Sequence, residues 1–136
     1  MQINPYLNFN GNCEAAFSLY ERVHGGKILF KMTHGESPMA GSVGPDWENK
    51  IMHASLAIGD RVIQGSDAPA QHYSKPGGYR ISIDTKDSAE AERVFSELSE
   101  GGSVQMPLQQ TFWAPKFGLL TDQFGIPWMV TCEQAS

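Results

Sequence analysis

His53 is the residue of this chain with the clearest capacity for acid–base chemistry. It opens the stretch HASLAI, which alternates as a β-strand does, so His53 shares a face with Ser55 and Ala57, whose small side chains leave room for a substrate. A histidine in that setting can act as a general base near neutral pH, with Asp67 as the carboxylate that orients it. The alternative is a histidine that only forms hydrogen bonds at the end of its strand.

The remaining reactive groups give no familiar catalytic pattern. Cys13 and Cys132 lie far apart and have no neighbours spaced for a zinc site or a CxxC redox motif, so we expect both to be reduced and not catalytic. No serine or cysteine lies in a nucleophile elbow, and neither a GxGxxG motif nor a P-loop is present. His24 ends a predicted helix, where a positive charge suits the helix dipole, whereas His34 and His72 lie in loops.

Composition excludes several classes of function. The chain has 136 residues, enough for one domain or for two small units that share a core. It carries 10 Lys and Arg against 15 Asp and Glu, for a net charge of −5, and no basic run, so we expect no nucleic-acid partner. No apolar stretch approaches the roughly 20 residues of a membrane span, and no leader is evident at Met1. We expect a soluble, cytoplasmic protein that does not contact a membrane.

The elements that position these residues occur twice in the same order. The first set comprises a strand over 3–11, a helix over 12–26, a strand over 27–35, a loop, and a hairpin with strands 51–58 and 61–67. The second set comprises a strand over 79–84, a helix over 88–102, a strand over 103–110 and a final hairpin over 116–133 that turns near 123–125. Asn12 is the expected N-cap of the first helix and Asp87 or Ser88 that of the second, and a Gly-Gly pair ends each helix.

This repetition predicts the architecture. Residues 1–67 and 78–133 each form a βαβββ unit with a helix on one face of its sheet, and one unit alone would leave the other face half covered. We therefore expect a single α+β domain over 1–136, in which two tandem units form a curled, eight-stranded mixed sheet with the helices outside. The concave inner side is a trough, and we expect the function there.

Alternation along the strands assigns side chains to the two faces. Leu7, Phe9, Ile81 and Ile83 point toward the helices, so their neighbours point into the trough. The predicted ligand-binding residues of the strands are Tyr6, Asn8, Gln64, Ser66, Asp67, Arg80, Ser82 and Met129. Neutral hydrogen-bonding groups with one cation suit a small polar or anionic molecule that has an apolar part. In the alternative, Arg80 pairs with a carboxylate and side chains fill the trough.

Two loops add aromatic residues. The stretch QQTFWAPKFG, residues 109–118, contains Phe112, Trp113 and Phe117, each of which would bury on the order of 150–250 Å² if covered. A loop seldom leaves such side chains exposed without a ligand or partner, so they form either core or subunit contact, or the wall of a pocket that Trp113 and Phe117 line. The loop 35–50, with Trp47, is long enough to act as a lid.

The paired βαβββ pattern resembles the vicinal oxygen chelate superfamily, which includes glyoxalase I, extradiol dioxygenases and bleomycin-resistance proteins. Within it, the segments PYLNFNGNCEAAFSLY, HASLAIGDRVIQGSD and MPLQQTFWAPKFGLLTDQFGIPWMV resemble the PhnB-like branch. The resemblance covers essentially the whole chain. It implies a cytoplasmic homodimer with the trough at or near the subunit contact.

The resemblance also implies four metal ligands, usually His and Glu, from the first, fourth, fifth and eighth strands. These positions fall on Asn4 or Pro5, Gln64, Gly78 and Met129. Proline and glycine offer no ligand atom, the two amides are weak ligands, and a thioether does not suit Mg²⁺, Mn²⁺ or an oxygen-liganded Zn²⁺. We therefore expect that the metal site is lost and that no cofactor is bound.

The sequence favours a dimeric, PhnB-like protein that binds an unidentified small molecule in its trough. One alternative is a metal-independent enzyme that uses His53 and Arg80 for proton transfer or isomerisation, and another is a ligand-sequestering protein of the bleomycin-resistance type. The sequence has no glycine-rich loop directly after a strand to bind the methyl donor of a methyltransferase.

Overall fold

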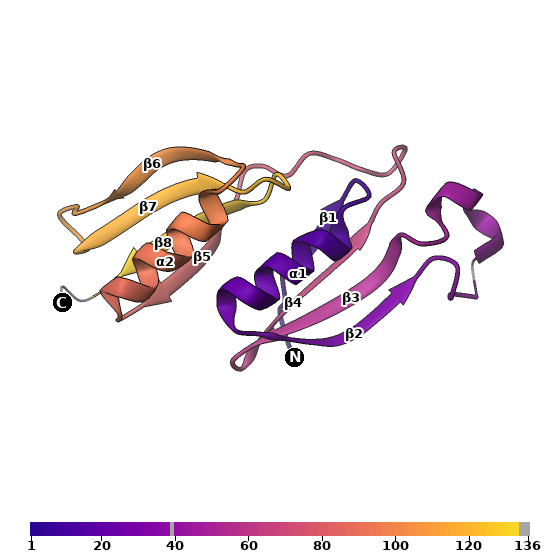
Figure 1. The fold of residues 1–136 in the computed structure, drawn as a ribbon, viewed down its shortest axis with the longest axis horizontal. Helices are drawn as coiled ribbons and strands as arrows, with labels where there is room; N and C mark the ends of the chain where they lie inside the picture. The colour runs from indigo at the N-terminus through magenta and orange to yellow at the C-terminus, as the bar shows by residue number, and fades with distance from the viewer. Residues whose placement is uncertain (39, 134–136) are drawn as a thin grey trace. The chain divides into compact units, whose positions relative to one another are not determined.

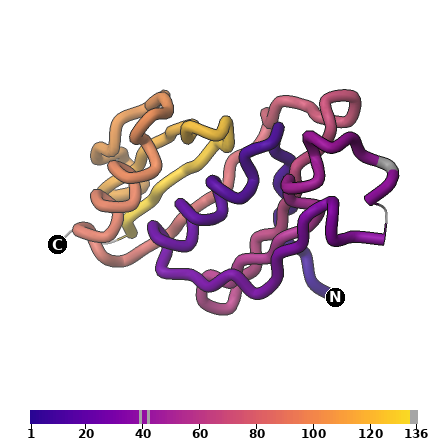
Figure 2. Tube along the Cα trace, turned by 45° about the vertical axis from the view of Figure 1, so that its right-hand side comes forward, coloured from indigo at the N-terminus to yellow at the C-terminus, as the bar shows by residue number. Residues whose placement is uncertain are grey.

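The computed structural model describes residues 1–38 and 40–133. The chain divides into two compact units, Met1–Ser74 and a second that begins at Lys75. Each unit consists of one strand, one helix and three further strands. Figure 2 traces the chain through both units, coloured by residue number. The predicted α+β fold with two βαβββ repeats is confirmed.

The N-terminal unit is a four-stranded mixed sheet with one helix. Its elements are β1 (Tyr6–Phe9), α1 (Cys13–His24), β2 (Lys27–Thr33), β3 (Ile51–Ile58) and β4 (Arg61–Asp67). The strand order is β1-β4-β3-β2, in which β1 runs parallel to β4 and the other neighbours are antiparallel. Two short 3-10 turns, Ala40–Ser42 and Pro45–Trp47, lie in the loop between β2 and β3.

The C-terminal unit repeats this connectivity. Its elements are β5 (Ile81–Thr85), α2 (Ser88–Ser99), β6 (Ser103–Gln109), β7 (Lys116–Thr121) and β8 (Pro127–Cys132). The strand order is β5-β8-β7-β6, with β5 parallel to β8 and antiparallel pairing elsewhere. In both units, the first strand thus pairs in parallel with the last strand.

One face of each sheet is covered by its own helix, as Figure 1 shows for α1 and α2. In the N-terminal unit Leu7 and Phe9 are buried, and the Phe9 ring meets the edge of Phe17 from α1 at a centroid distance of 6.1 Å. In the C-terminal unit the buried side of the sheet carries Trp128 and Val130. The other face of each sheet is left open within its unit, and it carries the alternate residues.

The two helix N-termini are stabilised in different ways. Asp87 accepts hydrogen bonds from the backbone N–H groups of Ala89 and Glu90, so the expected cap of α2 is confirmed. Asn12 occupies the N-cap position of α1 as expected, but its side chain forms no capping hydrogen bond. The backbone N–H of Cys13, the first residue of α1, donates instead to the carboxylate of Asp67, 54 residues away. At the C-terminus of α1, Gly25 adopts the left-handed conformation (φ 66°) that the Gly-Gly pair predicts.

Cys13 and Cys132 are free thiols, and both are completely buried. This agrees with the expectation that both cysteines are reduced. None of the helices in the described part of the chain is long and apolar enough to cross a membrane.

Candidate functional site

The open face of the N-terminal sheet carries a row of side chains that crosses all four strands. Strand register pairs Tyr6 with Gln64, Gln64 with Ser55, and Ser55 with Phe30. Paired residues in a sheet point to the same face, so one hydroxyl, one amide, a second hydroxyl and an aromatic ring lie in a line. A second row contains Asn8 beside Ser66 and His53 beside Met32. The predictions for Tyr6, Asn8, Gln64 and Ser66 thus converge on one surface.

His53 lies between aromatic rings on this surface. Its Nδ1 is 3.3 Å from the hydroxyl of Tyr6, and the two rings stack with centroids 5.7 Å apart. On its other side the Phe30 ring centroid lies at 5.8 Å, and Nε2 of His53 is 3.5 Å from the Ser55 hydroxyl. The imidazole therefore has a defined orientation, with polar groups near both ring nitrogens.

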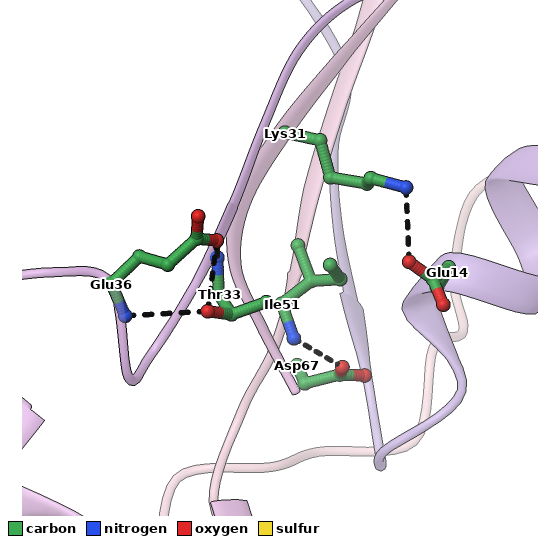
Figure 3. A network of polar contacts seen from close by, with 6 residues as sticks. All are labelled: Glu14, Lys31, Thr33, Glu36, Ile51 and Asp67. Atoms are coloured by element: carbon green, nitrogen blue, oxygen red, sulfur yellow. Dashed lines mark hydrogen bonds and ion pairs between the residues drawn. The ribbon is translucent and has the colours of Figure 1, made fainter. Parts of the chain in front are cut away.

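The expected pairing of His53 with Asp67 does not form. Oδ1 of Asp67 accepts the backbone N–H groups of Gly11 (3.0 Å) and Cys13 (2.9 Å), and Oδ2 accepts that of Ile51 (2.9 Å). Figure 3 shows the bond to Ile51, together with the nearby Lys31–Glu14 ion pair that joins β2 to α1. Asp67 is buried on the side that faces α1, because alternation along β4 puts Gln64 and Ser66 on the opposite side. We therefore assign Asp67 a structural role, in which it connects the loop before α1 to the start of β3.

The open face of the C-terminal sheet is less polar. A row formed by Ser82, Met129, Leu119 and Met106 crosses its four strands. Ser82 and Met129 therefore lie on the predicted face, and the Ser82 hydroxyl is 3.4 Å from the carboxylate of Asp84.

The aromatic loop between β6 and β7 is exposed. The Trp113 ring lies edge-on between Phe112, at a centroid distance of 4.7 Å, and Phe117, at 5.1 Å. Phe112 is 97% exposed and Trp113 is 55% exposed, beside a shallow hollow of about 350 Å³ that is lined by residues 110–115. Within the C-terminal unit these two rings are therefore not core, whereas Phe117 is half-buried.

Arg80 reaches across the end of the C-terminal sheet. From the residue before β5, its Nη1 donates to the carbonyls of Trp128 on β8 (3.2 Å) and Leu120 on β7 (3.1 Å), and it lies 3.4 Å from Oε1 of Gln105 on β6. No carboxylate in the described part of the chain pairs with it, so the expected alternative of an ion pair is not realised. Arg80 instead forms part of a pocket of about 690 Å³ at this end of the sheet.

The positions where the superfamily resemblance implies metal ligands carry the side chains expected from the sequence. Gln64 and Met129 lie on the open faces of their sheets, Asn4 and Pro5 precede β1, and Gly78 lies in the loop before β5. Among the described residues, no group of three or more His, Cys, Asp or Glu side chains is arranged to coordinate a metal ion. Amide, thioether and absent side chains do not fit a hard divalent cation.

Cys13, at the start of α1, is a buried thiol whose setting makes it unreactive. Burial raises the pKa of its thiol far above the ordinary range, and the nearby carboxylates of Asp67 and Glu14 raise it further. The thiol therefore stays protonated in the folded protein, which excludes it as a nucleophile at neutral pH.

The sequence analysis missed Phe30 and Met32 as members of the open face. A register shift between Ile28 and Phe30 interrupts the alternation of β2, so the face of these residues could not be read from the strand pattern. It also missed the residues around Arg80, because they come from loops and strand ends distant in sequence.

Comparisons with known proteins agree with this architecture. Residues 1–131 match the family model described as 3-demethylubiquinone-9 3-methyltransferase. Protein YjdN of Escherichia coli K12 is 36% identical over 140 residues, which cover 96% of this chain and 94% of YjdN. The crystal structure of protein PA1353 from Pseudomonas aeruginosa is 49% identical, with 99% of both chains covered and a TM-score of 0.88.

More distant structures share the fold. A PhnB protein from Bacillus cereus is 23% identical, with 97% of this chain and 99% of that one covered and a TM-score of 0.84. A member of the glyoxalase/bleomycin resistance protein/dioxygenase superfamily from Sphaerobacter thermophilus is 19% identical, with 98% of both chains covered and a TM-score of 0.59. These two likenesses concern the fold alone.

Proposed function

The chain belongs to the 3-demethylubiquinone-9 3-methyltransferase family, in its PhnB-like branch, and on that premise we propose that it binds a small organic molecule without a divalent metal. The ligand lies against the open face of the N-terminal sheet. Its recognition uses the hydroxyl of Tyr6, the amides of Asn8 and Gln64, and the imidazole of His53.

The observation that carries this proposal is the Tyr6–His53–Phe30 cluster with its adjoining row of polar side chains. Tyr6 and Phe30 are 46% and 44% exposed, so two aromatic rings flank a histidine on an otherwise polar sheet surface. Binding sites for small molecules combine apolar and aromatic walls with a few fixed hydrogen-bonding groups. Here the aromatic rings supply the wall, and the hydroxyl, amide and imidazole side chains supply the fixed groups.

The family description names a methyltransferase, but our proposal concerns binding. The sequence offers no glycine-rich loop directly after a strand for a nucleoside-containing methyl donor. S-adenosylmethionine is therefore included among the test ligands as a probe of the alternative.

A thermal-shift screen of the purified protein tests the proposal. The probes are alkyl and aminoalkyl phosphonates, α-dicarbonyl compounds with their thiol adducts, aromatic antibiotics and S-adenosylmethionine. Because a ligand that binds only the folded state raises Tm in proportion to its affinity and concentration, we expect at least one of the first three classes to raise it. Stabilisation by S-adenosylmethionine alone would favour the methyltransferase alternative and overturn our proposal.

Amide spectra of the ¹⁵N-labelled protein locate the binding. We expect a stabilising compound to shift the signals of Tyr6, Ser55 and Gln64, which share one row. A ligand that leaves these signals unchanged contradicts the proposed location.

A second candidate function is metal-independent proton transfer at His53. It is favoured by the 3.3 Å approach of the Tyr6 hydroxyl to Nδ1. In the tautomer whose Nδ1–H donates to the tyrosine oxygen, Nε2 carries no proton and can act as a base. If this function holds, His53→Gln abolishes turnover of a bound compound while its affinity stays nearly unchanged.

Sequestration is distinguished from catalysis by the absence of product. A sequestering protein binds its compound tightly and returns it unmodified, and Trp113→Ala then lowers the affinity if the aromatic loop contributes to the site.

We also propose a homodimer, on the support of the exposed Leu29, Phe30 and Phe112 side chains. Light scattering during size-exclusion chromatography tests this, and a monomer at micromolar concentration contradicts it.

A further inference from the structure

The C-terminal unit contains a pocket of about 690 Å³ at one end of its sheet. Its walls come from the segment 75–80 before β5, the first half of β6, the last residue of β7 and the first residue of β8. All of the lining residues belong to the C-terminal unit, and none of them is a member of the Tyr6–His53 cluster.

The charge of the pocket lining is opposite in sign to that of the whole chain. The chain has a net charge of −5, yet the lining contains Lys75 and Arg80 and no Asp or Glu. Within residues 1–38 and 40–133, neither cation takes part in an ion pair. Two unneutralised positive charges beside one cavity attract an anion, most strongly at low ionic strength.

Arg80 is positioned for recognition by its own hydrogen bonds. Its Nη1 is directed to the carbonyls of Leu120 and Trp128, at 3.1 and 3.2 Å, which holds the plane of the guanidinium in place. The described residues provide no acceptor for its Nε or Nη2, which carry three of the five N–H donors of a guanidinium. A fixed guanidinium with donors remaining suits the paired oxygens of a carboxylate, phosphate or phosphonate.

Neutral side chains extend this donor set. The Thr121 hydroxyl donates to Oε1 of Gln105 (3.1 Å), and Nε2 of Gln105 donates to the Ser103 hydroxyl (3.0 Å). Because the Ser103 hydroxyl oxygen accepts the bond from Gln105, its own O–H remains as a donor at the pocket wall. This series of hydrogen bonds thus orients one more donor beside the two cations.

The rest of the wall suits an apolar ligand body. Tyr79 is 47% exposed at the pocket, with Pro76 and Pro127 also in the lining. Gly77 and Gly78 add no side chain, and a Cβ built on either one meets no atom within 4 Å, so space remains beside the cations.

From these features we propose that the pocket is a binding site for a small organic anion, with a phosphate, phosphonate or carboxylate group on Arg80 and Lys75 and an apolar portion against Tyr79. This goes beyond the proposed function, because it assigns a second site with its own ligand chemistry to the C-terminal unit.

Titration of the ¹⁵N-labelled full chain with phenyl phosphate, benzoate and uncharged phenol tests the proposal. We expect the two anions to shift the amide signals of Gly77, Gly78 and Thr121 saturably, and phenol to leave them unchanged. Comparison of phenyl phosphate with benzoate decides between a phosphate and a carboxylate head group. Equal binding of phenol, shifts confined to other residues, or no binding of either anion overturns the proposal.

Matched variants test the roles of the two cations. We expect Lys75→Gln and Arg80→Lys each to weaken anion binding about tenfold, because each loses a charge-assisted or bidentate contact. Lys86→Gln removes an exposed charge from the same unit outside the pocket and is expected to leave the affinity unchanged. If Lys75→Gln and Lys86→Gln have equal effects, the attraction is nonspecific and the site does not exist.

The two proposals fail independently. Gly77→Leu adds a bulky side chain to a residue of the pocket lining, where a Cβ meets no atom within 4 Å, and is expected to weaken anion binding without changing the amide signals of Tyr6, Ser55 and Gln64. Conversely, Tyr6→Phe and His53→Gln are expected to leave the response of Gly78 to phenyl phosphate unchanged. A loss of anion binding in these two variants would contradict a separate site.

Discussion

The hydroxyl of Tyr6 lies 3.3 Å from Nδ1 of His53, although their strands β1 and β3 are separated by β4 in the sheet. The side chain of Tyr6 therefore extends across β4 to reach the histidine. The stacked rings and the polar contact fix the imidazole at the centre of the open face. This relationship makes the two residues the first targets for mutation.

We expect Tyr6→Phe to weaken binding of any compound found at this face about fivefold to tenfold, because the variant keeps the ring and loses one hydrogen-bonding group worth about 1 kcal/mol. The measurement is isothermal titration calorimetry with the strongest compound from the thermal-shift screen. Tyr73→Phe makes the same chemical change in the loop after β4 of this unit and should have no effect. Equal affinities of wild type and Tyr6→Phe would show that the Tyr6 hydroxyl does not contribute to ligand binding.

Asp67→Asn should destabilise the protein by about 2–3 kcal/mol. The carboxylate accepts three backbone N–H groups through both of its oxygens, and an asparagine has to turn its own N–H₂ toward at least one of these donors. Urea denaturation followed by circular dichroism measures the change. Asp60→Asn, at a carboxylate that is 94% exposed, is the matched control and should change stability by only a few tenths of a kcal/mol. A loss below about 0.5 kcal/mol for Asp67→Asn would contradict the structural role.

Gly65→Ala should cost about 1–3 kcal/mol through overpacking. A Cβ at this position of β4 would lie 2.9 Å from both the carbonyl oxygen of Leu7 and the Phe17 ring, so α1 or β1 would have to shift. Gly77→Ala is the control, since its Cβ meets nothing within 4 Å. Thermal unfolding of the two variants compares them, and equal Tm values would show that α1 does not pack closely on β4.

Cys13 should react with a thiol reagent only after unfolding. Its buried thiol has a raised pKa, whereas an exposed cysteine in the unfolded chain ionises near pH 8.5. In a Cys132→Ala background we expect slow reaction with a disulfide reagent in buffer and fast reaction in urea. Because the pKa of the Cys13 thiol is higher in the folded than in the unfolded protein, ionisation of the thiol favours unfolding. The stability associated with Cys13 is therefore intact below about pH 8.5 and is lost as the pH rises above that value. Rapid labelling of Cys13 in the native protein would contradict its assignment as a buried, unreactive thiol.

Purified protein should carry no stoichiometric divalent metal, because the positions implied as ligands offer only amide, thioether or no side-chain donors. Elemental analysis measures the bound metal, and Tm is compared with and without EDTA and with added Mn²⁺ or Zn²⁺. We expect no change in Tm beyond that of a control salt. A bound ion at one equivalent per chain, or a rise in Tm with one metal alone, would refute the loss of the metal site.

Local patterns in the sequence predicted most of the fold. The apolar periodicity within 12–26 and 88–102 predicted the two helices, which the structure places at 13–24 and 88–99, and Gly25 and Asp87 mark helix ends as expected. Alternation placed Tyr6, Asn8, Gln64 and Ser66 on the face away from α1, which the strand register confirms. These features are predictable because each depends on residues a few positions apart.

Contacts between distant residues were decided only by the tertiary structure. Asp67 lies beside Gln64 and Ser66 in sequence, yet it supports the start of α1, because a buried carboxylate must satisfy its oxygens with whichever backbone N–H groups the fold brings near. The orientation of the Arg80 guanidinium is likewise set by hydrogen bonds to carbonyls 40 and 48 residues away. The bulge in β2 brings Phe30 beside His53. Periodicity thus determined which face a side chain occupies, whereas its partners followed from strand pairing and helix packing, which join segments that no local pattern relates.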